Sequence, residues 1–260
     1  MKKPKIRKVV VFSDVHLPNE DQQAVSTMLR FIKDFKPDEI VINGDLMDFA
    51  SISRHDGLHE EIVEEDLGIG NFFFDVLQRT APQAKLHYNF GNHCLRLQSF
   101  VENNAPQLRG LLTLEKELNL KARGVSFLPY ASDKLHWLTD KLAVHHGFAH
   151  GVHYTKTTLD KFQVSTIVGH CHRPLMHSAP TVGRKGHQVR GCWGLGCLVP
   201  VDHVSYMTAP PGWCQGFGVV TINEDTQNFN VYPVIMSEKE FMWTDGTVYK
   251  PSSEGWRYED

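Results

Sequence analysis

The chain has 260 residues, of which 41% are hydrophobic and 22% charged, enough for a sizeable buried core in one or two domains. Its formal net charge of −3 argues against avid nucleic-acid or membrane binding. Five cysteines without a C-x2-C pair argue against a disulfide framework and a four-cysteine zinc site.

No segment approaches the ~18 consecutive apolar residues of a membrane span. The basic N-terminus is followed only by "VVVF", which is too short for a signal peptide. We therefore expect a cytoplasmic protein with no membrane partner and no stable nucleic-acid complex. The oligomeric state is left open.

The first elements form a predicted βαβ unit over 8–43. Residues 8–13 are a short β-branched run typical of a buried strand. A helix follows, with Asn19 as its expected N-cap and Pro37 as its stop, because apolar residues then recur at helical spacing. Residues 39–43 form the second strand, which the right-handed crossover places parallel to the first.

The pattern continues with a helix over 60–79, a strand over 85–90 and helices at about 95–103 and 108–119. Closely spaced strands then follow at 125–129, 134–138, 141–146 and 165–169. Residues 174–216 give weak strand signals, 217–222 and 229–235 indicate a closing hairpin, and the last twenty residues give no clear signal. We predict one α/β (α+β) domain over 1–260, with two packed mixed β-sheets flanked by helices. Its motifs lie within 14–172, its β-rich closing part at 174–240 and a tail at 241–260.

Polar side chains follow five of the predicted strands, at the point where each strand ends. In α/β sheets, ligands bind beyond the carboxyl ends of the strands, so these groups could converge on one cleft. Carboxylate, imidazole and amide groups together form a mixed nitrogen and oxygen donor set, which suits Mn²⁺, Fe or Zn²⁺ and differs from a soft thiolate site. The five groups are Asp14 and His16, Asp45 and Asp48, Asn92 and His93, His145 and His146, and His170 and His172.

These donors are too many for one tetrahedral ion but suffice for two ions that share a bridging ligand. Two ions about 3.5–4 Å apart can clamp a phosphoryl group and generate a hydroxide nucleophile. The pattern therefore favours phosphoester hydrolysis.

The ordered motifs D-x-H, G-D-x-x-D, G-N-H, H-x-G and G-H-x-H, spread over residues 14–172, resemble those of the calcineurin-like metallophosphoesterase superfamily. The resemblance implies a fold of two mixed sheets flanked by helices. It also implies two divalent ions as cofactors, Mn²⁺ foremost, with Fe, Zn²⁺ and Ni²⁺ as alternatives. The implied ligands are Asp14, His16 and His172 for the first ion, Asp45 as the bridge, and Asn92, His170 and His145 for the second, with His146 as the alternative to His145.

The same resemblance makes His93 the catalytic histidine, which would protonate the leaving oxygen or stabilise charge on the phosphoryl group. Asp48 would orient it; the alternative for Asp48 is a helix-capping acid. Cys94 stands where the family usually carries an acid, so we expect altered support of that loop, with Cys94 a buried small residue rather than a redox-sensitive thiol.

The Asp-Arg-Gly extension of protein Ser/Thr phosphatases is missing, which favours a phosphodiesterase acting on small phosphoesters or nucleotide-type substrates. Arg96, the substrate-binding candidate, and Arg54 could take the place of the arginines that bind a monoester in those enzymes; the alternative for each is an ordinary surface residue. The competing hypotheses are a phosphomonoesterase resembling the Ser/Thr phosphatases and a non-catalytic scaffold of the same fold. The presence of His93 counts against the scaffold.

Two further features are open at this point. Trp193, Trp213 and Phe217 would either stack a nucleobase or pack the turns of the second sheet. Residues 53–66, with His55 and His59, would form either a lid or a solvated loop leading into a helix.

Overall fold

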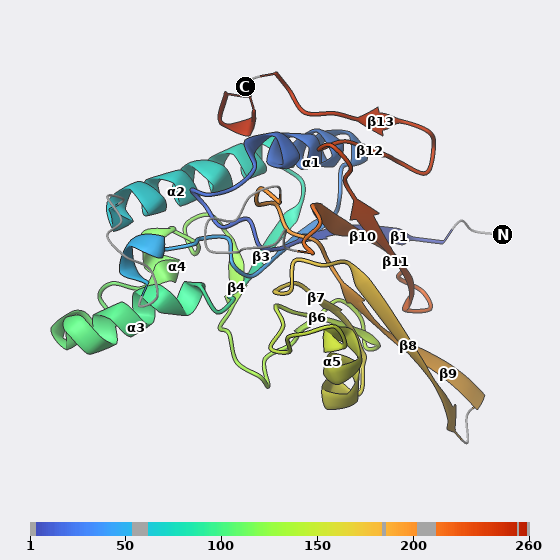
Figure 1. Cartoon of the computed structure of the whole chain (residues 1–260). Coiled ribbons are helices and arrows are strands. Elements are labelled where there is room, and N and C mark those ends of the chain that lie inside the picture. Colours follow the sequence, from blue (N-terminus) through green and yellow to red (C-terminus); the bar gives the residue numbers. More distant parts are fainter. Residues whose placement is uncertain (1–3, 54–61, 184–185, 202–211, 254, 259–260) are drawn as a thin grey trace.

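The computed structural model describes residues 4–258, except 54–61, 184–185, 202–211 and 254. Two mixed β-sheets pack face to face, and helices cover their outer faces (Figure 1). This arrangement confirms the predicted fold class. The first sheet has the order β11-β10-β1-β2-β3-β4, with bounds Asn228–Ile235, Gly216–Asn223, Ile6–Phe12, Glu39–Asn43, Lys85–Asn89 and Ser126–Leu128. The second has the order β5-β6-β7-β9-β8, with bounds His136–Trp137, Leu142–His145, Ser165–Val168, Gly186–Gly194 and Leu175–Gly183.

Parallel pairing brings the ends of the motif-bearing strands to one edge of each sheet. In the first sheet β1, β2, β3 and β4 run parallel, with Phe12 opposite Ile42 and Asn43 opposite Asn89. In the second sheet β6 and β7 run parallel, with His145 opposite Val168. Because loops leave parallel strands at the same edge, the polar residues after them are carried to neighbouring positions.

Alternation along the strands of the first sheet divides its buried apolar residues between two layers. Val10 and Phe12 of β1 belong to the cluster beneath the helices, whereas Val9 and Val11 belong to the cluster between the sheets. The helices are α1 (Gln22–Phe35), α2 (Val63–Thr80), α3 (Cys94–Asn104), α4 (Leu114–Glu117) and α5 (Tyr154–Phe162), with 3₁₀ turns at Ala50–Ile52, Pro106–Leu108 and Trp256–Tyr258.

The βαβ unit is as predicted, but the helix cap is not. Asp21, rather than Asn19, is the N-cap of α1, and its carboxylate accepts from the backbone N–H groups of Gln23 and Ala24 at 3.0 and 3.1 Å. The Asn19 side chain instead donates to Asp48 at 3.0 Å. Lys36 ends the helix in a left-handed conformation directly before Pro37.

Other expectations required correction in the second half. In place of one helix over 108–119, the chain has a 3₁₀ turn that ends at Leu108 and the four-residue α4. The nine-residue α5 is a helix that the sequence reasoning missed. The strands β8 and β9 form a long hairpin that projects from the body within a region of weak strand signals (Figure 1). Helix α5 is short and polar on its outer side, and β8 and β9 are interrupted by Gly and Pro, so local periodicity is weak in both.

The tail is ordered by packing rather than by strong local propensity. A two-stranded ribbon, β12 (Phe241–Met242) with β13 (Val248–Tyr249), lies along α1. Trp256 is fully buried, donates to Glu20 at 2.9 Å and packs edge-on against Phe73 of α2. No helix among the described residues is long and apolar enough to cross a membrane.

Candidate metal centre

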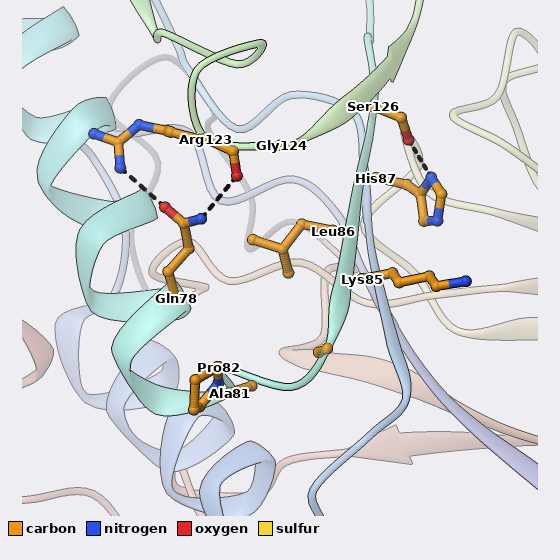
Figure 2. Close-up of a pocket in the computed structure, with 10 residues that line it drawn as sticks. Gln78, Ala81, Pro82, Lys85, Leu86, His87, Arg123, Gly124 and Ser126 are labelled. Carbon is orange, nitrogen blue, oxygen red and sulfur yellow. Dashed lines mark hydrogen bonds between the residues drawn. The ribbon is translucent and has the colours of Figure 1, made fainter.

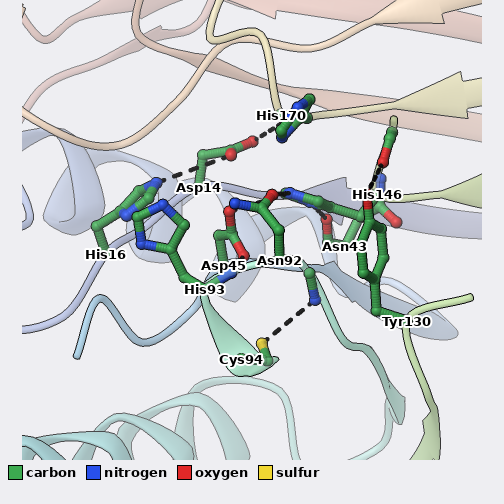
Figure 3. Close-up of polar contacts among 12 residues, drawn as sticks. Asp14, His16, Asn43, Asp45, Asn92, His93, Cys94, Tyr130, His146 and His170 are labelled. Atoms are coloured by element: carbon green, nitrogen blue, oxygen red, sulfur yellow. Dashed lines mark hydrogen bonds and ion pairs between the residues drawn. The ribbon is translucent and has the colours of Figure 1, made fainter. Parts of the chain in front are cut away.

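The predicted polar groups converge at the edge where the parallel strands of both sheets end. Figure 3 shows Asp14 and His16 after β1, Asp45 after β2, Asn92 and His93 after β3, and His146 and His170 from the second sheet, all pointing toward a common space. Most of these side chains are buried, and Asp14 has no exposed surface. The centre is therefore assembled from both sheets.

One group of donors joins the loop after β1 to the loop after β7. Asp14, His16 and His172 can hold one ion between them. The Oδ1 atom of Asp14 lies 3.1 Å from Nε2 of His172 and 3.8 Å from Nε2 of His16. The two Nε2 atoms of His16 and His172 face each other at 3.3 Å.

A second group lies beside the first and contains Asp45, His146 and His170. The Nε2 atom of His146 is 3.0 Å from Oδ2 of Asp45 and 3.1 Å from the amide oxygen of Asn92. Asp45 also belongs to a third set with His16 and His93, so its carboxylate lies between the two groups. Only a glycine fits at position 91, since a Cβ there would stand 2.2 Å from Oδ1 of Asp45.

The preference for His145 over His146 is wrong. His145 is the last residue of β6, and its ring points away from Asp45: Nδ1 accepts from the Gly147 backbone N–H at 2.9 Å, and Nε2 lies 3.2 Å from the Ala131 carbonyl. Its ring packs against Phe162 with the centroids 5.1 Å apart. Adjacent residues at a strand end face opposite ways, and here the second of the two faces the centre.

Five of the gathered residues adopt left-handed backbone conformations, which are uncommon outside glycine. Such conformations persist where the surrounding structure imposes them and they cluster at functional sites. The backbone is therefore not extended through 170–172, and the Cys171 thiol between the two histidines donates to the Ala149 carbonyl at 3.1 Å. The φ values are 57° at Asp14, 54° at His16, 46° at Asp45, 69° at His170 and 57° at His172.

Hydrogen bonds at Nδ1, the ring nitrogen that faces away from the centre, orient the imidazoles of His16 and His146. Nδ1 of His16 lies 3.0 Å from Oδ1 of Asp48, and Nδ1 of His146 lies 2.8 Å from the Asn43 carbonyl. A proton on each Nδ1 would leave Nε2 as a lone-pair donor aimed at the centre. Carboxylates and carbonyls behind metal-binding histidines characteristically fix the tautomer in this way.

Electrostatics of the centre favour bound cations. Burial would raise the pKa of Asp14, Asp45 and Asp48, but the neighbouring histidines outweigh it and hold all three carboxyl pKa values well below their usual range. Burial also opposes protonation of His16, yet Asp14 and Asp48 raise its pKa to about 10. The carboxylates thus favour a proton on metal-free His16 and on His146, whose pKa Asp45 and Asp14 raise to about 9, whereas burial and the charge of His146 lower the pKa of His170 to about 4.

The donor set fits two divalent ions. Ligand atoms about 2.0–2.2 Å from one ion lie about 3.0–3.5 Å apart for octahedral or tetrahedral geometry. The separations of 3.0 Å, 3.1 Å and 3.3 Å match that range, and the 3.8 Å separation of Asp14 and His16 exceeds it. Two imidazole nitrogens that face each other also need a proton or a cation between them.

His93 lies beside the centre with its own support. Its Nδ1 is 2.7 Å from Oδ1 of Asp48, and its ring stands edge-on to His16 with centroids 4.5 Å apart. Arg96 donates to the Asp48 carbonyl at 2.9 Å and places its second guanidinium nitrogen 3.4 Å from Nε2 of His93. Asp48 therefore touches both a candidate ligand and the candidate catalytic histidine.

Cys94 supports the loop from beneath. Its buried sulfur accepts from the Gly91 backbone N–H at 3.2 Å and lies 3.1 Å from the Tyr88 hydroxyl. Burial, reinforced by the charge of Asp45, raises the pKa of Cys94 to about 12. The thiol is thus protonated and structural, in line with the expectation of a buried small residue.

Residues outside the motifs complete the surroundings. Nε2 of His150 lies 3.2 Å from Nε2 of His170, and the Tyr130 hydroxyl donates to the Gly147 carbonyl at 2.6 Å. The sequence reasoning missed both; the recurrence of histidine in "HHGFAH" is the signal that could have found His150. Trp213 stands edge-on to His172 at 4.4 Å, whereas Trp193 packs on Phe229 away from the centre.

Phe217 is fully buried in the core beneath the helices, so it is a packing residue. Arg54, His55 and His59 lie outside the described residues, so the lid question at 53–66 stays open.

A family model described as calcineurin-like phosphoesterase matches residues 7–188, a span that contains every candidate ligand. The chain belongs to the calcineurin-like phosphoesterase family. This confirms the resemblance inferred from the five motifs. Membership in this phosphoesterase family supports metal-dependent hydrolysis of phosphoesters.

Similar proteins include two bacteriophage proteins, each named "Gene 54 protein". The one from Mycobacterium phage D29 is 28% identical over 247 residues, covering 88% of this chain and 94% of its own. The one from Mycobacterium phage L5 is 27% identical over 248 residues, with the same coverage.

Similar solved structures include a Vps29 mutant from Entamoeba histolytica, with a TM-score of 0.42, 13% identity, and coverage of 94% of this chain and 96% of that one. The purple acid phosphatase PPD1 from yellow lupin has a TM-score of 0.45 and 12% identity, with coverage of 95% and 53%.

Proposed function

We propose that this calcineurin-like phosphoesterase hydrolyses phosphodiesters of nucleotide or nucleic-acid type with two divalent ions, Mn²⁺ foremost. The observation that carries the proposal is the convergence of two donor groups on Asp45, with His93 directly beside them. The proposed ligands are Asp14, His16 and His172 for one ion, Asn92, His146 and His170 for the other, and Asp45 for both.

Ions bound there would supply a hydroxide nucleophile at neutral pH and neutralise negative charge on the phosphoryl oxygens. The residues of the chain provide position and proton transfer. Asp48 accepts from Nδ1 of His93, which directs Nε2 of that ring outward, where it can protonate the departing oxygen. The same carboxylate holds His16, so one residue aligns the leaving-group acid with the ion-binding ring.

Charge around the site supports a diester over a monoester. A phosphate monoester carries a dianion that enzymes commonly bind through paired arginines. Within the described part of the chain, Arg96 is the guanidinium next to His93, and one of its nitrogens already donates to Asp48. A single shared cation suits the monoanionic diester, and Trp213 beside His172 offers an aromatic surface for a base.

The test compares bis-p-nitrophenyl phosphate with p-nitrophenyl phosphate, using the Mn²⁺-loaded protein under identical conditions. We expect a higher kcat/KM for the diester and at least about a 100-fold lower kcat for His93→Ala, which is the lower end of the range for general acid catalysis. Arg173→Ala, which removes a guanidinium that donates to the Gly151 carbonyl at 3.4 Å, serves as a control for loss of positive charge. A clear preference for the monoester would refute the diesterase assignment, and no turnover of either substrate would favour a scaffold.

A further inference from the structure

A second set of metal-compatible side chains lies at the other end of the sheets. Glu39, His87 and His136 come from β2, β3 and β5, so the set joins both sheets. Glu39 begins β2 and Asp45 follows the end of that strand, so the two sites lie at opposite ends of β2, which is about 13 Å long from its first residue to its last. The set is thus independent of the phosphoesterase centre.

The three donors meet on one carboxylate oxygen. Oε1 of Glu39 lies 3.3 Å from Nε2 of His87 and 3.2 Å from Nε2 of His136, and the two rings are 4.5 Å apart between centroids. Two ligands of a tetrahedral zinc ion, each 2.0–2.2 Å from it, lie about 3.3–3.5 Å apart. The observed separations therefore need little adjustment to accept an ion.

Neighbouring groups support the carboxylate and one imidazole. Arg7 donates to Oε2 of Glu39, to the Leu138 carbonyl and, at 2.7 Å, to Glu224. Nδ1 of His87 contacts the Ser126 hydroxyl, and Figure 2 shows this pair on the side of β3 away from Leu86 and Gln78. Such outer contacts orient metal ligands and fix the histidine tautomer.

The location also suits a bound ion. Glu39 lies where the apolar layer between the sheets ends, and its side chain is 7% exposed, whereas those of His87 and His136 are 23% and 17% exposed. Solvent can therefore reach the two histidines and supply a fourth ligand.

We propose that Glu39, His87 and His136 bind a zinc-class divalent ion that clamps the two sheets together at the end opposite the phosphoesterase centre. Two imidazoles and one carboxylate are a donor set that Zn²⁺ and Fe²⁺ accept in proteins. The ion would stabilise the folded chain, because an unfolded chain does not present the three ligands together.

The test uses Zn²⁺ itself and the full chain in which Asp14→Asn and His146→Gln weaken the main centre. After removal of metals by a chelator and dialysis against Zn²⁺, this background is expected to retain one tight equivalent, measured by elemental analysis. It is also expected to show a Zn²⁺-dependent rise in Tm. Adding His136→Gln, or separately His87→Gln, should weaken that equivalent at least about 100-fold and remove the rise.

The matched control is His177→Gln, which removes a histidine from β8 of the second sheet. In the otherwise unmodified chain, His136→Gln is expected to keep phosphodiester turnover within about twofold, so the outcome does not depend on the proposed activity. Circular dichroism of the metal-free variants checks their folding, and the two separate glutamine variants guard against one that misfolds. If the background binds no tight Zn²⁺, or binds it equally with and without His136, the cluster is a hydrogen-bonded link between the sheets and the proposal is overturned.

Discussion

The neighbouring residues His145 and His146 allow a matched pair of substitutions with opposite expected results. His146→Gln removes a nitrogen that lies 3.0 Å from Asp45 and 3.1 Å from Asn92. His145→Gln removes a ring that faces Phe162 and accepts one backbone hydrogen bond. Both changes replace an imidazole by the same amide, one position apart.

The expected magnitudes follow from these contacts. Loss of a direct ligand should weaken binding of the second ion at least about 100-fold, because loss of a group that only hydrogen-bonds to a ligand already lowers metal affinity about 10–100-fold. If the ion contributes about 4 kcal/mol to transition-state stabilisation, turnover falls by about 10³. For His145→Gln, the Gly147 N–H loses its acceptor, which costs about 1–3 kcal/mol of folding stability. Turnover at saturating metal should stay within a few-fold.

The assay combines turnover at a fixed Mn²⁺ concentration that saturates the unmodified chain, metal content by elemental analysis, and Tm. We expect His146→Gln to lose metal and turnover with a small change in the metal-free Tm, and His145→Gln to lower Tm by several degrees while it keeps both. The reverse pattern, in which His145→Gln loses the ion and His146→Gln keeps it, would refute the assignment from the geometry.

Three further changes probe the same centre. Asp48→Asn should lower kcat by about 10–100-fold at saturating Mn²⁺ with the metal still bound, because it weakens the hydrogen bond that orients the His93 ring. An unchanged kcat would show that catalysis does not depend on this hydrogen bond. Because the pKa of metal-free His16 is raised to about 10, Mn²⁺ must displace a proton from this ring when it binds. The apparent affinity for Mn²⁺ should therefore rise up to about tenfold per pH unit between pH 7 and 9. Titration calorimetry measures this affinity, and an affinity independent of pH would contradict the prediction. Gly91→Ala should reduce turnover sharply, because the added Cβ would meet the Asp45 carboxylate. Gly68→Ala, on the open face of α2, should leave turnover intact and stabilise the fold by about 0.5–1 kcal/mol. Equal turnover in the two variants would argue against the close approach of Gly91 to Asp45.

The sequence could predict most of the fold around the site. Apolar runs followed closely by polar residues mark five of the strands, so both each strand and the point where it ends could be predicted; these are β1, β2, β3, β6 and β7. Helix α5 and the β8–β9 hairpin were not, because their local patterns are weak and packing against the second sheet determines them.

Within the site, the residue types were predictable, but side-chain direction was not. The choice between His145 and His146 depends on where β6 ends and the chain turns, a boundary that periodicity fixes only to within a few residues. The second role of Asp48, as support for His16, needed the loop conformations. The set formed by Glu39, His87 and His136 lies within strands, where each residue alone reads as an ordinary polar position, so only sheet register and sheet packing bring the three together.

The left-handed backbone at Asp14, His16, Asp45, His170 and His172 also bears on how this molecule can be engineered. Each such residue is held in a conformation that costs about 1–3 kcal/mol. The fold therefore gives up stability to hold its ligands, and ions that bind only the native state would restore it. A search for more stable variants in chelator would therefore favour substitutions that relieve these backbone conformations, at the expense of the metal centre.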